Sequence, residues 1–168
     1  SATAKLLTEI GTATAFIVLT DCRLDNFYGL FGIYEINYLI SVILSIFIFV
    51  VTINSYNLID GIDGLAGGYG IIAMIAFLFL SISANNLIGL ILCVTIIGSL
   101  AGFLKYNLSK GKRKIFMGDT GSLVVGFLIS VIVLINLSTK NDYSQISNNI
   151  PVLVLSILSF PYIDTLRV

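Results

Sequence analysis

The chain has 168 residues, of which 57% are hydrophobic and 11% are charged, and its mean hydropathy is +1.03. This composition lies outside the range of ordinary soluble domains and predicts an integral membrane protein. Nine basic and nine acidic residues cancel, so no global charge favours nucleic acid as a partner, and the absence of histidine excludes His-ligated zinc and a Ser-His-Asp triad from this stretch.

Apolar segments long enough to cross a bilayer follow one another along the chain. A helix needs about 20 residues to span the hydrocarbon core. About six segments approach this length: residues 4–19, 38–53, 66–83, 87–104, 121–137 and 150–163. The first is the weakest candidate because Lys5 and Glu9 interrupt it. No alternating pattern typical of a β-barrel occurs. The sequence therefore predicts an all-α, multi-pass transmembrane helical bundle, with residues 1–168 as part of one integral membrane domain of a longer protein.

The basic residues predict the orientation of this bundle. Alternate loops on one side carry only Arg23 and Lys140, together with several acidic residues. The other side carries seven basic residues: Lys5, Lys105, Lys110, Lys112, Arg113, Lys114 and Arg167. Short loops rich in Lys and Arg stay in the cytoplasm. The sequence thus predicts that residues 54–65 and 105–119 lie at the cytoplasmic face.

A polar cluster interrupts the apolar pattern after the second segment. It consists of two amides and two carboxylates, each three residues from the next: Asn54, Asn57, Asp60 and Asp63. Ionisable groups at a membrane cost several kcal/mol unless they have partners or a function. Gly61 and Gly64 disfavour a continuous helix here, so we expect a helix end that opens into a turn. A simpler alternative is a polar loop in which Asp63 caps the next helix.

A second cluster precedes the fifth segment. Five basic residues between positions 105 and 114 lead into Gly118-Asp119-Thr120-Gly121-Ser122, which opens an apolar helix. A carboxylate at such a helix start suits Mg²⁺, a hard cation that prefers oxygen ligands and substrate phosphates. Lys110 to Lys114 could equally serve only as positive-inside charge, and Asp119 could be a helix cap. Together, the two clusters favour phosphoryl transfer at a cytoplasmic mouth.

Two motifs resemble a known family. Residues 54–68 read Asn-Ser-Tyr-Asn-Leu-Ile-Asp-Gly-Ile-Asp-Gly-Leu-Ala-Gly-Gly, and residues 116–122 read Phe-Met-Gly-Asp-Thr-Gly-Ser. In this order they resemble the polyprenyl-phosphate N-acetylhexosamine-1-phosphate transferases of glycosyltransferase family 4, and most of all the WecA-like bacterial branch. The resemblance implies a Mg²⁺-dependent enzyme, with Mn²⁺ as an alternative ion. It implies transfer of a HexNAc-1-phosphate, first of all GlcNAc-1-phosphate, from a UDP-sugar to undecaprenyl phosphate with release of UMP.

The resemblance also implies roles for individual residues. Asp119 matches a Mg²⁺ ligand that Asn57 supports, and Asp60 matches an essential acidic residue, so that Asp60, Asp63 and Asp119 form the expected catalytic set. The expected substrate-binding residues are Asp63, Asn107, Phe116 and Lys5. Asp63, Asn107 and Phe116 fall at positions that hold the uridine, and Lys5 matches a basic position of the cleft. Asn54 receives no role.

The resemblance further implies what the chain lacks and where it works. An upstream Asp-Asp pair and a downstream His-containing loop are absent from it, so we expect the isolated chain to be inactive. The expected setting is the bacterial cytoplasmic membrane, where the enzyme starts a cell-surface polysaccharide such as lipopolysaccharide. The sugar, the polymer, single or double displacement, and assembly as a homodimer stay open.

A membrane transporter is the rival hypothesis. Asp60, Asp63 and Asp119 would then be cation or proton sites at broken helices, although such sites usually lie near the middle of the membrane. An intramembrane aspartyl protease does not fit, because its Gly-x-Gly-Asp motif would require glycine where this chain has Phe116.

Overall fold

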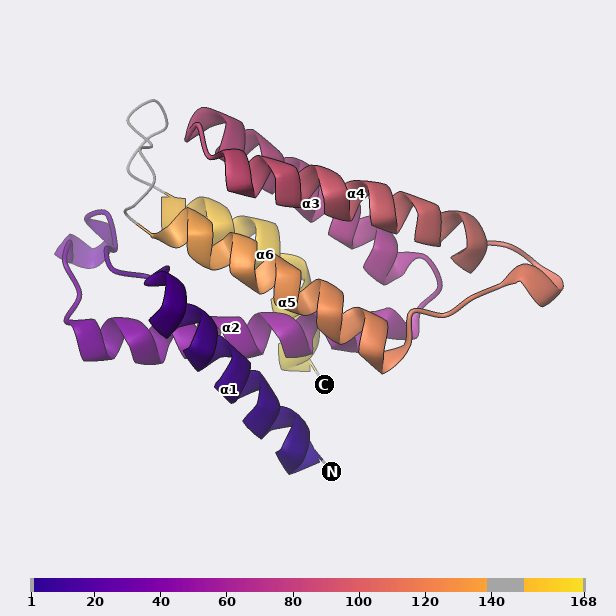
Figure 1. Ribbon diagram of the computed structural model, residues 1–168, viewed down its shortest axis with the longest axis horizontal. Helices are drawn as coiled ribbons and strands as arrows, with labels where there is room; N and C mark the ends of the chain where they lie inside the picture. The colour runs from indigo at the N-terminus through magenta and orange to yellow at the C-terminus, as the bar shows by residue number, and fades with distance from the viewer. Residues whose placement is uncertain (1, 139–149, 168) are drawn as a thin grey trace.

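The structure is a computed structural model that describes residues 2–138 and 150–167. These described residues form six α-helices, shown in Figure 1: α1 (Ala2–Thr20), α2 (Tyr38–Leu58), α3 (Leu65–Ser83), α4 (Leu87–Asn107), α5 (Gly118–Leu137) and α6 (Ile150–Arg167). Three 3-10 turns lie in the loops: η1 (Leu30–Gly32), η2 (Ile59–Gly61) and η3 (Gly111–Arg113). The part of the chain that is described has no named strand, only an isolated bridge between Asn26 and Glu35. The all-α prediction is confirmed.

Five of the described segments are long and apolar enough to cross a membrane: Tyr38–Gly61, Leu65–Ser83, Leu87–Asn107, Gly118–Leu137 and Ile150–Arg167. The expected six segments all became helices, but α1 is not among these five. Its interruption by Lys5 and Glu9 had already marked it as the weakest candidate. Lys140, which entered the orientation argument, lies outside the described residues.

The central packing unit of the bundle is the pair α2 and α5. Each of these helices contacts several others, while α3 and α4 pair with each other as an antiparallel hairpin (Figure 1). Gly126 of α5 allows the close approach, because a Cβ there would lie 3.0 Å from the Cα of Ile53. One turn further along α5, a hydrogen bond joins the same two helices: the Ser130 hydroxyl donates to the Phe49 carbonyl at 3.1 Å.

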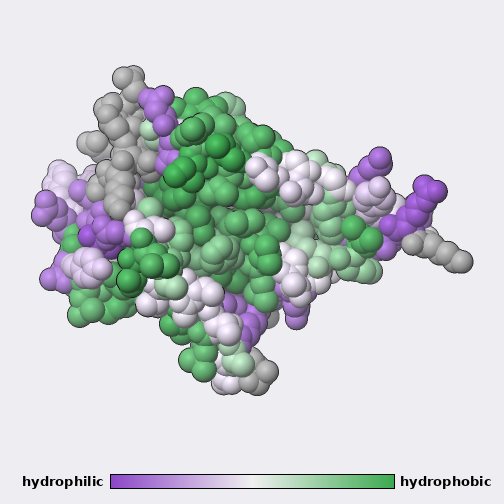
Figure 2. Space-filling model, viewed as in Figure 1, coloured by the Kyte–Doolittle hydropathy of each residue, from purple (hydrophilic) through white to green (hydrophobic). Residues whose placement is uncertain are grey.

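The surface has the pattern expected of a protein in lipid. Figure 2 shows hydrophobic residues over the middle of the molecule and hydrophilic residues mainly toward its two ends. Large apolar side chains such as Phe47, Ile72 and Phe79 are exposed on α2 and α3. Since hydrocarbon would cover such side chains, the exposed apolar surface agrees with a multi-pass membrane protein.

Candidate active site

The two polar motifs meet at one end of the bundle. The loop between α2 and α3 and the loop between α4 and α5 both lie there (Figure 1). Asn107, the last residue of α4, joins them. Its Oδ1 accepts from the backbone N–H of Gly64 at 2.6 Å, and its Nδ2 donates to the Ile115 carbonyl at 2.9 Å. The side chain is 4% exposed, so both of its polar groups are committed to the protein backbone.

The polar cluster after the second apolar run spans a helix end and a turn, as predicted. Asn54 and Asn57 lie in the last turns of α2, Asp60 lies in η2, and Asp63 follows in the connecting loop. Gly64 takes a φ of +78°, which glycine adopts without strain, and α3 begins at the next residue. The Tyr56 hydroxyl reinforces the turn by donating to the Ala66 carbonyl at 2.9 Å.

Asp63 does not cap α3. Gly64 is the residue at the N-cap, and no side chain there bonds the first turn. Instead, the Asp63 carboxylate pairs with the Lys114 ammonium, which also lies 5.0 Å from the centroid of the Phe116 ring. Phe116 itself is 71% exposed. The result is an open surface on which an acidic group, a cation and an aromatic ring are neighbours.

Asp60 and Asp119 approach each other at the start of α5. The Asp60 carboxylate lies near the backbone of Gly118 and close enough to Asp119 for the two charges to repel. Asp119 is exposed in the first turn of α5, where the helix dipole favours an anion. It does not occupy the N-cap, which is Met117.

This pair of carboxylates fits a hard cation with few protein ligands. No group of three or more His, Cys, Asp or Glu side chains able to hold a metal occurs within residues 2–138 and 150–167. Mg²⁺ is commonly bound through one or two carboxylates, with water and substrate phosphates completing its shell. The oxygen donors of Asp60 and Asp119 therefore match Mg²⁺ better than a softer metal, which would call for sulfur or imidazole ligands.

A chain of hydrogen bonds links three helices beside these carboxylates. The Lys5 ammonium on α1 donates to Asn57 Oδ1 at 2.9 Å, and Asn57 Nδ2 donates to Ser122 Oγ on α5 at 2.6 Å. The Ser122 hydroxyl lies within reach of the carbonyls of Gly118, at 3.0 Å, and Asp119, at 3.2 Å. Lys5, which the sequence placed only near a basic position, thus lies next to the Asn57 that was expected to support the metal.

A second contact between α1 and α2 was not anticipated. Asn54 Nδ2 donates to Glu9 Oε2 at 2.6 Å, and Glu9 is 6% exposed. The spacing held a signal for it: Lys5 and Glu9 are four residues apart on α1, and Asn54 and Asn57 are three apart on α2. Residues at these spacings share a helix face, so two polar pairs could have been matched across the two helices.

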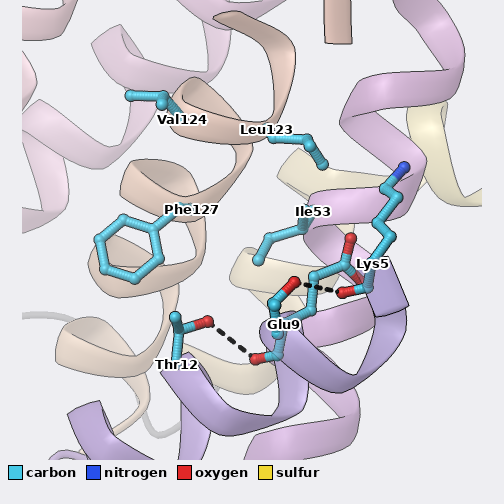
Figure 3. Close-up of a pocket in the computed structure, with 8 residues that line it drawn as sticks. Lys5, Glu9, Thr12, Ile53, Leu123, Val124 and Phe127 are labelled. Carbon is cyan, nitrogen blue, oxygen red and sulfur yellow. Dashed lines mark hydrogen bonds between the residues drawn. The ribbon is translucent and has the colours of Figure 1, made fainter. Parts of the chain in front are cut away.

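A cavity of about 220 Å³ adjoins this contact between α1, α2 and α5. The surface that lines it is mostly apolar, although four polar residues of α1 contribute to it beside four apolar residues of α2 and α5: Lys5, Thr8, Glu9, Thr12, Ile53, Leu123, Val124 and Phe127. In Figure 3, Leu123 and Phe127 stand on one side and the α1 residues on the other, with Ile53 between them. The Thr12 hydroxyl is used within α1, where it donates to the Glu9 carbonyl at 2.9 Å.

Comparisons with known proteins identify the family. The model for glycosyl transferase family 4 matches residues 1–137. The chain is 35% identical over 167 residues to the probable undecaprenyl-phosphate N-acetylglucosaminyl 1-phosphate transferase of Bacillus subtilis (strain 168). The matched region covers 98% of this chain and 44% of that protein. It is 36% identical over 135 residues to the phospho-N-acetylmuramoyl-pentapeptide-transferase of Staphylococcus aureus (strain bovine RF122 / ET3-1), covering 76% of this chain and 41% of that protein. The chain spans less than half the length of these relatives, and it belongs to glycosyl transferase family 4.

Proposed function

We propose that this chain is part of a membrane enzyme that transfers a HexNAc-1-phosphate, most of all GlcNAc-1-phosphate, from a UDP-sugar to undecaprenyl phosphate and releases UMP. The observation that carries the proposal is the meeting of Asp60 and Asp119, from two separate motifs, beside the Lys5–Asn57–Ser122 chain. The relative that covers nearly all of this chain bears the name of such a transferase.

In this proposal, the reaction replaces one phosphorus–oxygen bond by another. An oxygen of the lipid phosphate attacks the phosphorus that is bonded to the sugar. The bond from that phosphorus to the oxygen shared with the uridine monophosphate breaks, and UMP leaves with that oxygen. The sugar–phosphate bond stays intact. Positioning and charge neutralisation supply most of the catalysis in phosphoryl transfer.

The charge and chemistry of each residue suggest its role in this reaction. Asp119 would hold Mg²⁺, with Asp60 and the Asn57 amide as neighbours that support the ion, and the ion would neutralise negative charge on the diphosphate. Lys5 supplies a second positive charge at Asn57. Asp63 and the exposed ring of Phe116 face the uridine, since an accessible aromatic face suits stacking with a base. Asn107 acts on the same end of the substrate through the two loops that it joins.

The orientation proposed for the enzyme places this end of the bundle in the cytoplasm of a bacterial cell. Lys5 and Lys114 contact residues of the candidate site, and Lys105 and Lys110 lie in the last turn of α4 and the loop after it, at the same end of the bundle, whereas Arg23 lies in the loop at the opposite end. Basic residues at the site end agree with the positive-inside rule. The carboxylates lie at one end of the helices rather than near their middle, so the arrangement offers no support to the transporter alternative.

An exchange assay tests the function directly. Membranes that contain the intact protein are given undecaprenyl phosphate, Mg²⁺ and one of a panel of radiolabelled UDP-sugars, and UMP and the lipid-linked sugar phosphate are measured. The expected result is product formation that requires both the lipid phosphate and Mg²⁺, and that is lost in Asp119→Ala. UMP release without the lipid, or wild-type turnover in Asp119→Ala, would contradict the proposal. The panel also identifies the sugar.

A further inference from the structure

The contact between Glu9 and Asn54 has no place in the proposed reaction, although it lies one helical turn from residues that do. Lys5 and Glu9 occupy successive turns of α1, and Asn57 and Asn54 occupy successive turns of α2. The two helices are therefore joined by two parallel polar contacts: Lys5 to Asn57 at 2.9 Å and Asn54 to Glu9 at 2.6 Å. The first contact belongs to the candidate site, and the second lies deeper along the helices.

The position of Glu9 is energetically unfavourable for a carboxylate. It is 6% exposed, and its Oε1 is buried with no hydrogen-bond partner in the described part of the chain. The carboxylate faces a mostly apolar cavity, and its side-chain hydrogen bond comes from Asn54. A buried, partly satisfied carboxylate destabilises a fold, so its presence here calls for another purpose. An apolar residue would line the cavity without this desolvation cost.

The geometry suggests that purpose. Lys5 ends in a long, flexible side chain whose position depends on where α1 lies relative to α2. A hydrogen bond to a carboxylate is short and strongly directional, so the Asn54–Glu9 contact defines the register of the two helices one turn away from Lys5. Asn57 is also bonded to Ser122 on α5, so the register of α1 decides whether the Lys5 charge reaches the start of α5.

We propose that Glu9, through Asn54, is a positioning residue that holds the Lys5 ammonium on Asn57 and thereby at the candidate active site. This inference rests on the proposed function for its consequence, the loss of turnover, but its geometric part can be tested separately. Asn54, to which the sequence motif assigned no role, becomes the partner of Glu9 on α2.

The test compares variants of the intact protein in membranes. Glu9→Ala and Asn54→Ala remove the contact from either side, whereas Glu9→Gln keeps an oxygen that can accept from Asn54. Thr12→Val is the matched control, because Thr12 lines the same cavity but bonds only within α1. A displacement of about 1 Å in a positioned group can lower turnover by roughly 100-fold. We expect kcat to fall by about 10- to 100-fold in both alanine variants with little change in KM for the UDP-sugar, and Glu9→Gln and Thr12→Val to retain most of the activity.

A second measurement does not depend on turnover. Lys5 is acylated with an amine-reactive reagent, and the extent of modification is read by mass spectrometry. Glu9→Ala and Asn54→Ala should raise the rate of Lys5 modification, because its ammonium is released from Asn57, while Glu9→Gln and Thr12→Val should not. Unchanged Lys5 labelling in both alanine variants would overturn the inference. So would an equal loss of activity in Glu9→Gln. If the alanine variants show raised Lys5 labelling but the wild-type protein shows no transferase activity, the proposed function is contradicted and the positioning role stands.

Discussion

Asn107 binds the backbone of Gly64 across two loops, with its Oδ1 only 2.6 Å from the Gly64 nitrogen. The same side chain donates to the Ile115 carbonyl, so the motif that carries Asp63 and the loop that carries Phe116 are attached to one buried amide. The relative position of the carboxylate and the aromatic ring therefore depends on a residue that bonds to the backbone of each loop.

Substitution of Asn107 should separate these two loops. Asn107→Ala removes both hydrogen bonds, and each contributes about 0.5–1.5 kcal/mol, because the Gly64 N–H and the Ile115 carbonyl belong to residues that are only partly covered. We expect lower thermal stability and a higher KM for the UDP-sugar, measured by unfolding in detergent and by the exchange assay. Asn107→Asp keeps the acceptor for Gly64, but it buries a charge and turns a carboxylate oxygen toward the Ile115 carbonyl, so it should lower stability at least as much as Asn107→Ala. An unchanged KM in Asn107→Ala would show that the contact does not position the site.

The ring of Phe116 offers a second prediction. It is exposed, and its contact with the Lys114 ammonium is one that other aromatic residues can also make. Phe116→Leu should raise KM for the UDP-sugar by about 10-fold, since stacking of a base on an aromatic ring is worth roughly 1–3 kcal/mol. Phe116→Tyr should bind nearly as well as the wild type. Equal affinity in the leucine and tyrosine variants, measured by competition with UMP, would remove the ring from base recognition.

The ion pair between Asp63 and Lys114 should matter little for stability. Both side chains are partly exposed, and such pairs contribute about 0–1 kcal/mol. Lys114→Met should therefore change the melting temperature only slightly, while it frees the Asp63 carboxylate. If Asp63 serves the substrate, the exchange assay should show altered KM in Lys114→Met at low salt. A large loss of stability would instead assign the pair a structural role.

Much of the architecture could be predicted because long apolar runs are an unambiguous signal in a helical membrane protein. The second apolar segment was nonetheless shorter than the helix that contains it. The apolar run ends at residue 53, and the helix continues to Leu58, because Asn54 and Asn57 remain helical while their side chains bond to α1. A polar residue looks like an interruption in the sequence, and only its partner on another helix shows that it belongs to a helical face.

The parts of the site that could not be predicted have partners far away in the sequence. The inward position of Asn107 depends on hydrogen bonds to two backbone groups. Every residue type has such groups, so the sequence does not show which of them Asn107 will bond. Glu9 was counted only as an interruption of the first apolar segment, since nothing local distinguishes a buried carboxylate with an amide partner from an exposed one. By contrast, the meeting of Asp60 and Asp119 followed from loop parity, which placed both motifs at the same end.

Substitution of Asp119 should change the Mg²⁺ dependence of the transferase activity, whereas substitution of an exposed carboxylate far from the site should not. Asp119→Asn keeps the shape of the side chain but removes a charge that favours a hard cation. In the exchange assay, the Mg²⁺ concentration that the Asp119→Asn variant needs for half-maximal activity should rise by roughly 10- to 100-fold, as is common when a metal site is weakened. Glu35→Gln, at the opposite end of the bundle, is the control and should leave the Mg²⁺ titration unchanged. A normal titration in Asp119→Asn would exclude this carboxylate as a ligand.

The close contact between α2 and α5 gives a prediction that needs no substrate. In Gly126→Ala, the new Cβ would lie 3.0 Å from the Cα and 3.2 Å from the carbonyl oxygen of Ile53, and neither backbone atom can move without the helix. Overpacking of this kind costs about 1–3 kcal/mol, and it would also shift Asn57 relative to Ser122.

Gly98 on α4 is the matched control, because a Cβ there meets nothing within 4 Å and alanine is the better helix former by about 1 kcal/mol. Gly126→Ala should therefore lower the melting temperature and the transferase activity together, whereas Gly98→Ala should leave activity unchanged and stability equal or higher. Equal melting temperatures in the two variants would mean that α2 and α5 are not packed as closely as the Ile53 contact requires.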